Sequence, residues 1–208
     1  MNIHAHTFTA PGLVSLTLMW FGMMAAMMTP TVWPWVRAFA RFGGRATGRL
    51  PRLYATTLFS SGYLLAWLLY SVAAAMLQRL LIDVGGVDAR GGIAPMAGAV
   101  ILIVAGLVQF APLKRACLMH CRNPLSYFLT RWCDGPAGGF RMGFGHGLFC
   151  VGCCWALMAT ALAVGMTNLW WMAALAAVAF VEQVVPYGDR LRVPMGMVLV
   201  AYGLRIAA

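Results

Sequence analysis

Cysteine and histidine gather in two short windows of this chain of 208 residues. The first window, PLKRACLMHCRNP at 112–124, holds two cysteines and one histidine, and the second, HGLFCVGCCW at 146–155, holds one histidine and three cysteines. Residues three or four positions apart share one face of a helix, so each window would present its thiols and imidazole together. Such a set can chelate a soft metal ion. The candidate ligands are Cys117, His120, Cys121, His146, Cys150, Cys153 and Cys154.

Methionine supplies a second kind of soft ligand near the N-terminus. The segment MWFGMMAAMMTP at 19–30 contains two pairs of methionines one helical turn apart, Met23 with Met27 and Met24 with Met28. Thioethers together with thiolates favour Cu(I), because zinc sites are built from thiolate, imidazole and carboxylate ligands. We therefore expect copper, as Cu(I), with Met24 and Met28 as the methionine ligands. Zinc and haem are the alternatives.

Two further residues are candidates for a role at the same site. Cys133 lies in the segment between the two windows. Glu182 is the single acidic residue inside an apolar stretch, and carboxylates within a membrane are usually paired or functional. Glu182 is expected either to pair with an arginine of a basic segment or to take part in metal or proton handling.

The composition indicates an integral membrane protein of the all-α class. Hydrophobic residues make up 62% of the chain and charged residues 10%, and the mean hydropathy is +0.80, whereas soluble domains are about a quarter charged. Six apolar stretches approach the roughly 20 residues that a spanning helix needs. Pro11, Pro95 and Pro194 are expected in the first turns of the first, third and sixth helices, and Asn168 is expected to cap the fifth. We expect one domain over 1–208, a bundle of about six transmembrane helices near 11–29, 55–78, 95–110, 147–164, 169–185 and 193–207.

Basic residues are distributed unevenly between these stretches. The segments after the first, third and fifth stretch hold twelve of the fifteen Lys and Arg residues. The positive-inside rule places those segments in the cytoplasm and both termini outside. This orientation brings the methionine pairs and both cysteine windows to one depth, in the cytoplasmic half of the membrane. Anionic lipid headgroups explain the net charge of +10, so the lipid bilayer is an expected partner and nucleic acid is not.

Four motifs follow one another along the chain: MWFGMMAAMMTP, QFAPLKRACLMHCRNPLSYF, RMGFGHGLFCVGCCWALM and MTNLWWMAALAAVAFVEQVVPYG. In this order they resemble a bacterial family of predicted metal-binding integral membrane proteins, over most of the chain from about Trp20 to Gly188. The resemblance implies metal binding in the bacterial cytoplasmic (inner) membrane, without an established reaction, and carries over the five cysteines of the two windows and His146 as ligands. One departure is Gln183, where the family usually has lysine. This departure leaves the charge partner of Glu182 open.

These observations predict a membrane protein that holds, delivers or transports Cu(I), or an accessory subunit of a copper-dependent membrane oxidase or monooxygenase. Enzymatic activity is not expected, because no phosphate-binding loop follows a predicted strand and no acidic residues are paired for acid–base catalysis. Two alternatives remain. The cysteines could form a thiol–disulfide redox protein, or His120 and His146 could bind a noncovalent b-type haem.

Overall fold

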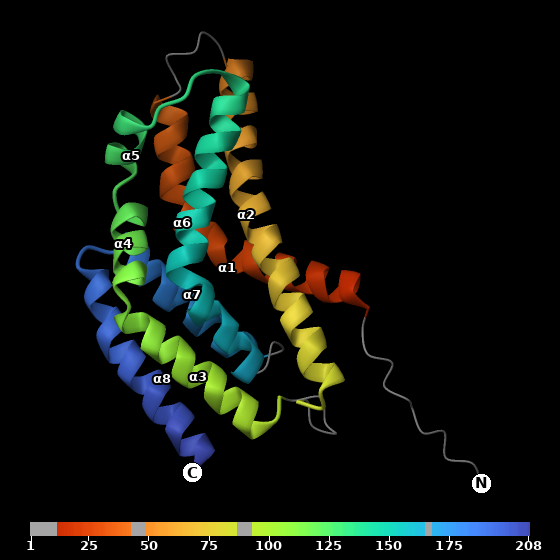
Figure 1. Cartoon of the computed structure of the whole chain (residues 1–208). Helices are drawn as coiled ribbons and strands as arrows, with labels where there is room; N and C mark the ends of the chain where they lie inside the picture. Colours follow the sequence, from red (N-terminus) through yellow and green to blue (C-terminus); the bar gives the residue numbers. More distant parts are fainter. Residues whose placement is uncertain (1–11, 43–48, 87–92, 165–167) are drawn as a thin grey trace.

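The computed structural model describes residues 12–42, 49–86, 93–164 and 168–208, and these parts of the chain are largely helical (Figure 1). Within them the predicted all-α class is confirmed, and a short 3₁₀ helix, Gly188–Leu191, precedes the last α-helix. The α-helices are α1 (Leu13–Phe42), α2 (Arg49–Asp83), α3 (Pro95–Phe110), α4 (Pro112–Cys121), α5 (Pro124–Thr130), α6 (Gly135–Val164), α7 (Leu169–Val184) and α8 (Arg192–Ala207).

The helix α6 lies at the centre of the bundle and contacts α2, α3, α4 and α7. α2 runs beside α6, and α3 runs beside α8 (Figure 1). α1 packs against α2 and α7, and it changes direction along its length (Figure 1). Pro30 and Pro34 lie inside α1, and a proline inside a helix removes a backbone hydrogen bond and bends the helix.

Two glycines let α6 approach α2 closely. A Cβ atom at Gly143 would overlap the backbone oxygen of Phe59, and one at Gly147 would lie 2.7 Å from the Cβ atom of Ala66. The absence of these side chains allows the two helix backbones to touch, as small residues do in membrane bundles. This close contact fixes α6, which carries the second cysteine window, against α2.

In the part of the chain that the structure describes, helix length and composition support three membrane spans, or four if the bent pair α3 and α4 forms one. The three long apolar segments are Leu13–Phe42, Arg52–Asp83 and Ala137–Val164. α7 and α8 have 16 residues each, which is about 24 Å of helix and less than the roughly 30 Å of hydrocarbon in a bilayer. The expected helices at 169–185 and 193–207 are present, but their lengths do not support the predicted count of six spans.

Three of the expected helices are much longer than their apolar stretches. The stretch at 11–29 continues as α1 to Phe42, the stretch at 55–78 is the middle of α2, and the stretch at 147–164 is the second part of α6. The sequence prediction limited each helix to its apolar stretch, because arginine, glycine or proline become frequent beyond it. In the structure these residues continue the helices. Residue 11 itself lies outside the described residues.

Prolines and one asparagine set the starts of the shorter helices. Pro95, Pro112 and Pro124 occupy the first turns of α3, α4 and α5, where a missing N–H is tolerated. Ala111 is extended, as residues before proline prefer, and α4 is bent by 68° from α3. This bend directs α4 along α6. The prediction that Asn168 caps α7 is confirmed, because its side chain accepts hydrogen bonds from two backbone N–H groups of the first turn.

Two groups of buried side chains fill the bundle. The larger core runs through most of the helices and contains the cysteines of both windows and the four methionines of α1. The smaller group, here called the aromatic cluster, lies where α5 meets the end of α1 and the first halves of α2 and α6. It consists of Trp35, Phe39, Phe59, Tyr127, Phe128 and Met142.

Candidate metal centre

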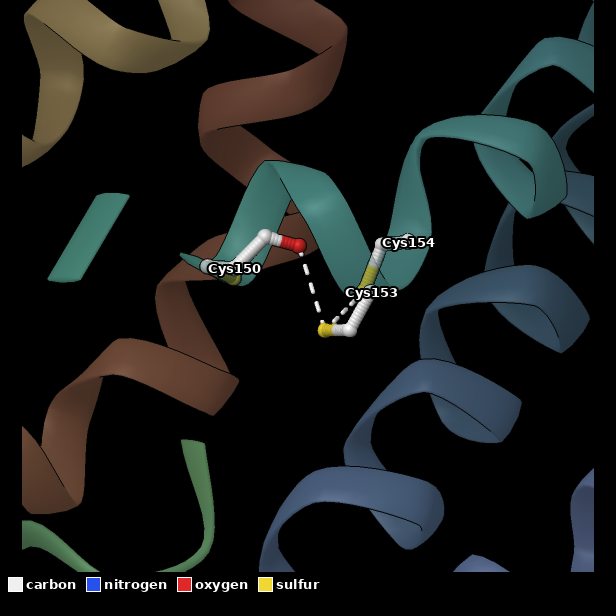
Figure 2. A group of neighbouring side chains, drawn as sticks. All are labelled: Cys150, Cys153 and Cys154. Atoms are coloured by element: carbon white, nitrogen blue, oxygen red, sulfur yellow. Dashed lines mark hydrogen bonds between the residues drawn. The ribbon is translucent and has the colours of Figure 1, made fainter. Parts of the chain in front are cut away.

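Three thiols of α6 form a compact buried group, here called the thiol cluster. The Sγ atoms of Cys150, Cys153 and Cys154 all lie within 4.8 Å of one another, and each residue is at most 3% exposed. The thiol of Cys153 donates a hydrogen bond to the carbonyl oxygen of Cys150 at 3.1 Å, and its Sγ atom lies 3.3 Å from that of Cys154 (Figure 2). The spacing of three and four residues along one helix produces this grouping.

The bent helix α4 brings a fourth thiol to the cluster. The Sγ atom of Cys121 lies 3.9 Å from that of Cys153. Cys117, one turn earlier on α4, packs over Gly152, where an added Cβ atom would lie 3.0 Å from its Sγ atom. Both α4 cysteines are buried. The two windows, distant in sequence, therefore place their thiols in one region between α4 and α6.

Two side chains that were not among the predicted site residues contact the thiols. The hydroxyl of Tyr63, on α2, lies 3.4 Å from the Sγ atom of Cys150. The amide of Gln183, on α7, donates from Nε2 to the Sγ atom of Cys154 at 2.8 Å and accepts at Oε1 from the thiol of Cys150 at 3.5 Å. A glutamine inside an apolar helix was a signal that could have been used for Gln183. Tyr63 carried no such signal, because tyrosine is common on buried helix faces.

The two histidines lie against aromatic rings beside the thiol cluster. The ring of His146 stacks on Trp35 with 3.6 Å between centroids, and the ring of His120 stacks on Phe149 at 3.7 Å. Within the described part of the chain, Nδ1 of His146 and Nε2 of His120 are buried and form no hydrogen bond. Trp35 also donates from Nε1 to the carbonyl oxygen of Cys121 at 2.9 Å. One tryptophan of α1 thus contacts a candidate ligand of α6 and the backbone of α4.

The methionines and Cys133 occupy different places. Met23, Met24, Met27 and Met28 are all buried in the core that contains the thiol cluster. Cys133 packs against the aromatic cluster instead, and it is only partly buried. The structure therefore places the methionine face of α1 in the same core as the thiols, and it separates Cys133 from them.

Glu182 forms a buried ion pair, and its charge partner is Lys114. Its Oε2 atom accepts a hydrogen bond from Nζ of Lys114 at 2.7 Å, and the two side chains are 1% and 2% exposed. Lys114 also donates to the side chain of Gln109, and Arg122 donates to the backbone oxygen of Glu182 at 2.7 Å. The partner is a lysine in the first turn of α4, whereas the two expectations were an arginine of a basic segment or a role in metal or proton handling. The pair ties the end of α7 to the helix that carries Cys121.

A comparison with known families now identifies the class of protein. A family model described as a copper chaperone (PpoB2) matches residues 17–206. The chain belongs to this family. The match extends from α1 to α8. The expected metal-binding family is thus a copper-related one, and the expectation of copper handling agrees with its description. No curated protein and no solved structure matches the chain.

Proposed function

We propose that the chain is a membrane copper chaperone that binds Cu(I) at the thiol cluster and passes it to a copper-dependent membrane oxidase or monooxygenase. The observation that carries this proposal is the packing of three buried thiols within 4.8 Å of one another. Soft thiolate ligands select Cu(I). Membership of a copper chaperone family supports the same metal.

The thiol cluster would supply the main ligands, with Cys121 as the ligand from α4. Cu(I) needs only two or three sulfur ligands, so a site with a fourth thiol 3.9 Å away can exchange one ligand without releasing the ion. Cys117 and the thioethers of Met24 and Met28 are the proposed exchange ligands, with Met23 and Met27 beside them. The unpaired ring nitrogens of the two histidines would serve as further positions for the ion.

The proposed location is the bacterial inner membrane, with both termini outside and the basic segments in the cytoplasm. In this orientation the thiol cluster lies in the cytoplasmic half of the membrane, where the reducing cytoplasm keeps its thiols free. A crossing by α7 and α8, as six spans require, needs local thinning of the bilayer around these two helices. The exposed apolar side chains of the bundle would contact lipid or a partner membrane subunit.

The first test is elemental analysis of the full chain purified in detergent under reducing, oxygen-free conditions. We expect near-stoichiometric copper in the wild-type protein and its loss in the triple variant Cys150→Ser, Cys153→Ser, Cys154→Ser, because a serine hydroxyl is a poor ligand for Cu(I). Cys133→Ser is the matched control and should retain copper, since Cys133 packs elsewhere. Wild-type protein without copper after supplementation would contradict the proposal.

One distance favours a second candidate, a membrane thiol–disulfide redox protein. Cys121 and Cys153 lie on different helices with their Sγ atoms 3.9 Å apart, so small movements would allow a bond between them. In that reaction the two thiols would give two electrons and two protons to a quinone, producing one disulfide and one quinol. Copper-free protein that reduces a quinone in proportion to disulfide formed would support this candidate.

A further inference from the structure

The side chain of Gln183 is inserted between two thiols of the thiol cluster. It comes from the end of α7, it is 5% exposed, and both ends of its amide contact sulfur. Nε2 donates to Cys154 at 2.8 Å and Oε1 accepts from Cys150 at 3.5 Å. The bonded partners of this amide are therefore two candidate metal ligands.

Packing alone does not explain an amide at this position. A buried amide costs free energy unless its donor and acceptor are paired, and a leucine of similar size would fill the same space without that requirement. The free energy of burying Gln183 is offset here by its bonds to Cys150 and Cys154. The hydrogen bonds to these two sulfur atoms explain why a glutamine occupies this position of an apolar helix.

The preceding residue of α7, Glu182, contacts α4 from the same turn. Glu182 forms the buried ion pair with Lys114 in the first turn of α4, and α4 carries Cys121. Two consecutive residues of α7 thus contact the two helices that supply thiols. Gln183 contacts α6 through hydrogen bonds between its amide and sulfur, and Glu182 contacts α4 through a salt bridge. This turn of α7 positions the α6 thiols and the α4 thiol relative to each other.

We propose that Gln183 is a positioning residue of the copper site, which holds Cys150 and Cys154 at chelating spacing before Cu(I) binds. This inference rests on the proposed function. The bond from the Cys150 thiol to Oε1 ends when that sulfur binds the metal, whereas the N–H of the amide continues to donate to the sulfur of Cys154. Gln183 therefore sets both the affinity of the site and the electronic state of one of its sulfur ligands.

The test compares Gln183→Leu with wild-type protein, as full chains purified without oxygen and loaded with Cu(I). Gln78→Leu is the matched control, because Gln78 is a glutamine of another helix whose side chain accepts from Trp20 and not from a cysteine. Dissociation constants are measured by competition with a chromophoric Cu(I) chelator. The ultraviolet charge-transfer band of the copper–thiolate bonds is recorded for each protein.

Gln183→Leu should still bind one equivalent of Cu(I), but with a dissociation constant about 10- to 100-fold higher, as is typical when a residue that orients metal ligands is lost. Its charge-transfer band should move to lower energy, because the N–H donor no longer stabilises the lone pair of the sulfur. Gln78→Leu should change neither quantity. A general loss of packing would not move the band.

The outcomes separate the two proposals. Wild-type affinity and an unshifted band in Gln183→Leu would overturn the role of Gln183 while copper binding by the wild-type protein stands. If the wild-type protein binds no copper, the proposed function itself fails. Should the leucine variant not fold, Gln183→Asn keeps the amide on a side chain shorter by one carbon. Its dissociation constant should rise and its band should move, and wild-type values for both would refute the proposal.

Discussion

Cys121 brings a thiol from α4 to the thiol cluster of α6. Its Sγ atom is 3.9 Å from that of Cys153, and Trp35 holds its backbone by a hydrogen bond at 2.9 Å. α6 alone provides three thiols, so Cys121 decides whether the site is confined to one helix or shared by two. A shared site allows a movement of α4 to change the number of ligands.

We predict that Cys121→Ser raises the dissociation constant of Cu(I) about tenfold, which corresponds to about 1.4 kcal/mol, without lowering the stoichiometry. The physical reason is that the thiol cluster still holds the ion after the fourth sulfur is removed. Competition with a chromophoric chelator measures the change, and Cys133→Ser should behave as wild type. Equal affinities for wild type and Cys121→Ser would mean that α6 binds copper without α4.

The residues of the thiol cluster could be predicted from sequence because their proximity is local. Positions three and four apart meet on any helix, so the spacing of Cys150, Cys153 and Cys154 was sufficient. Tyr63 and Gln183 reach the same sulfurs through the packing of α2 and α7 on α6. No pattern within either helix specifies that contact. Tyr63 was therefore missed, and Gln183 was noted only as a departure from the family pattern, not as a neighbour of the thiols.

At the scale of helices, the ion pair between Lys114 and Glu182 holds α4 to α7. Both charges are buried, and a buried pair contributes little net stability but is costly to break. Arg122 reinforces the same contact by donating to the backbone of Glu182 at 2.7 Å. The main effect of the pair is therefore to fix the position of α4 against α7, and its net contribution to the free energy of unfolding is small.

We predict that Glu182→Leu lowers the free energy of unfolding by about 3–5 kcal/mol, because it leaves the charge of Lys114 buried without a counter-charge. The double variant Lys114→Met, Glu182→Leu should recover most of this loss, since it buries no charge. Chemical unfolding in detergent, followed by circular dichroism, measures both. A double variant as unstable as the single one would show that Lys114 is not destabilising when unpaired.

The helices themselves were partly predictable. Pro95 and Asn168 mark helix starts through local chemistry, and both predictions agree with the structure. The ends of α1 and α2 were placed too early and the starts of α2 and α6 too late, because arginine and glycine were interpreted as loop residues. Tertiary contacts override those propensities: Gly143 lies within α6 where α2 approaches most closely.

For the whole molecule, the long helices extend beyond the thickness of a membrane. α2 has 35 residues and α6 has 30, or about 52 and 45 Å, against roughly 30 Å of hydrocarbon. The excess coincides with the aromatic cluster, at the arginine-bearing ends of these helices. With the proposed orientation, this part of the bundle lies on the cytoplasmic side.

We predict that alkaline phosphatase fused after Ala208 is active in intact bacteria, whereas the same enzyme inserted after Pro186 is inactive. The turn after α7 lies beside the basic segment that follows α4, because Asp189 is 3.8 Å from Arg122. Both belong on the cytoplasmic face, where the phosphatase does not acquire its disulfides. Activity at both positions would show that α7 does not cross, and inactivity after Ala208 would overturn the proposed orientation.

The three thiols of α6 have a consequence for biogenesis. The three cysteines come onto neighbouring turns of one helix as soon as that segment of α6 is helical, before α4 and α7 have packed against it. Cys121 and Gln183 join only when those helices dock. A newly inserted chain would thus be able to capture copper before its bundle is complete, and the captured ion would then favour docking of α4 by offering its sulfur a bond.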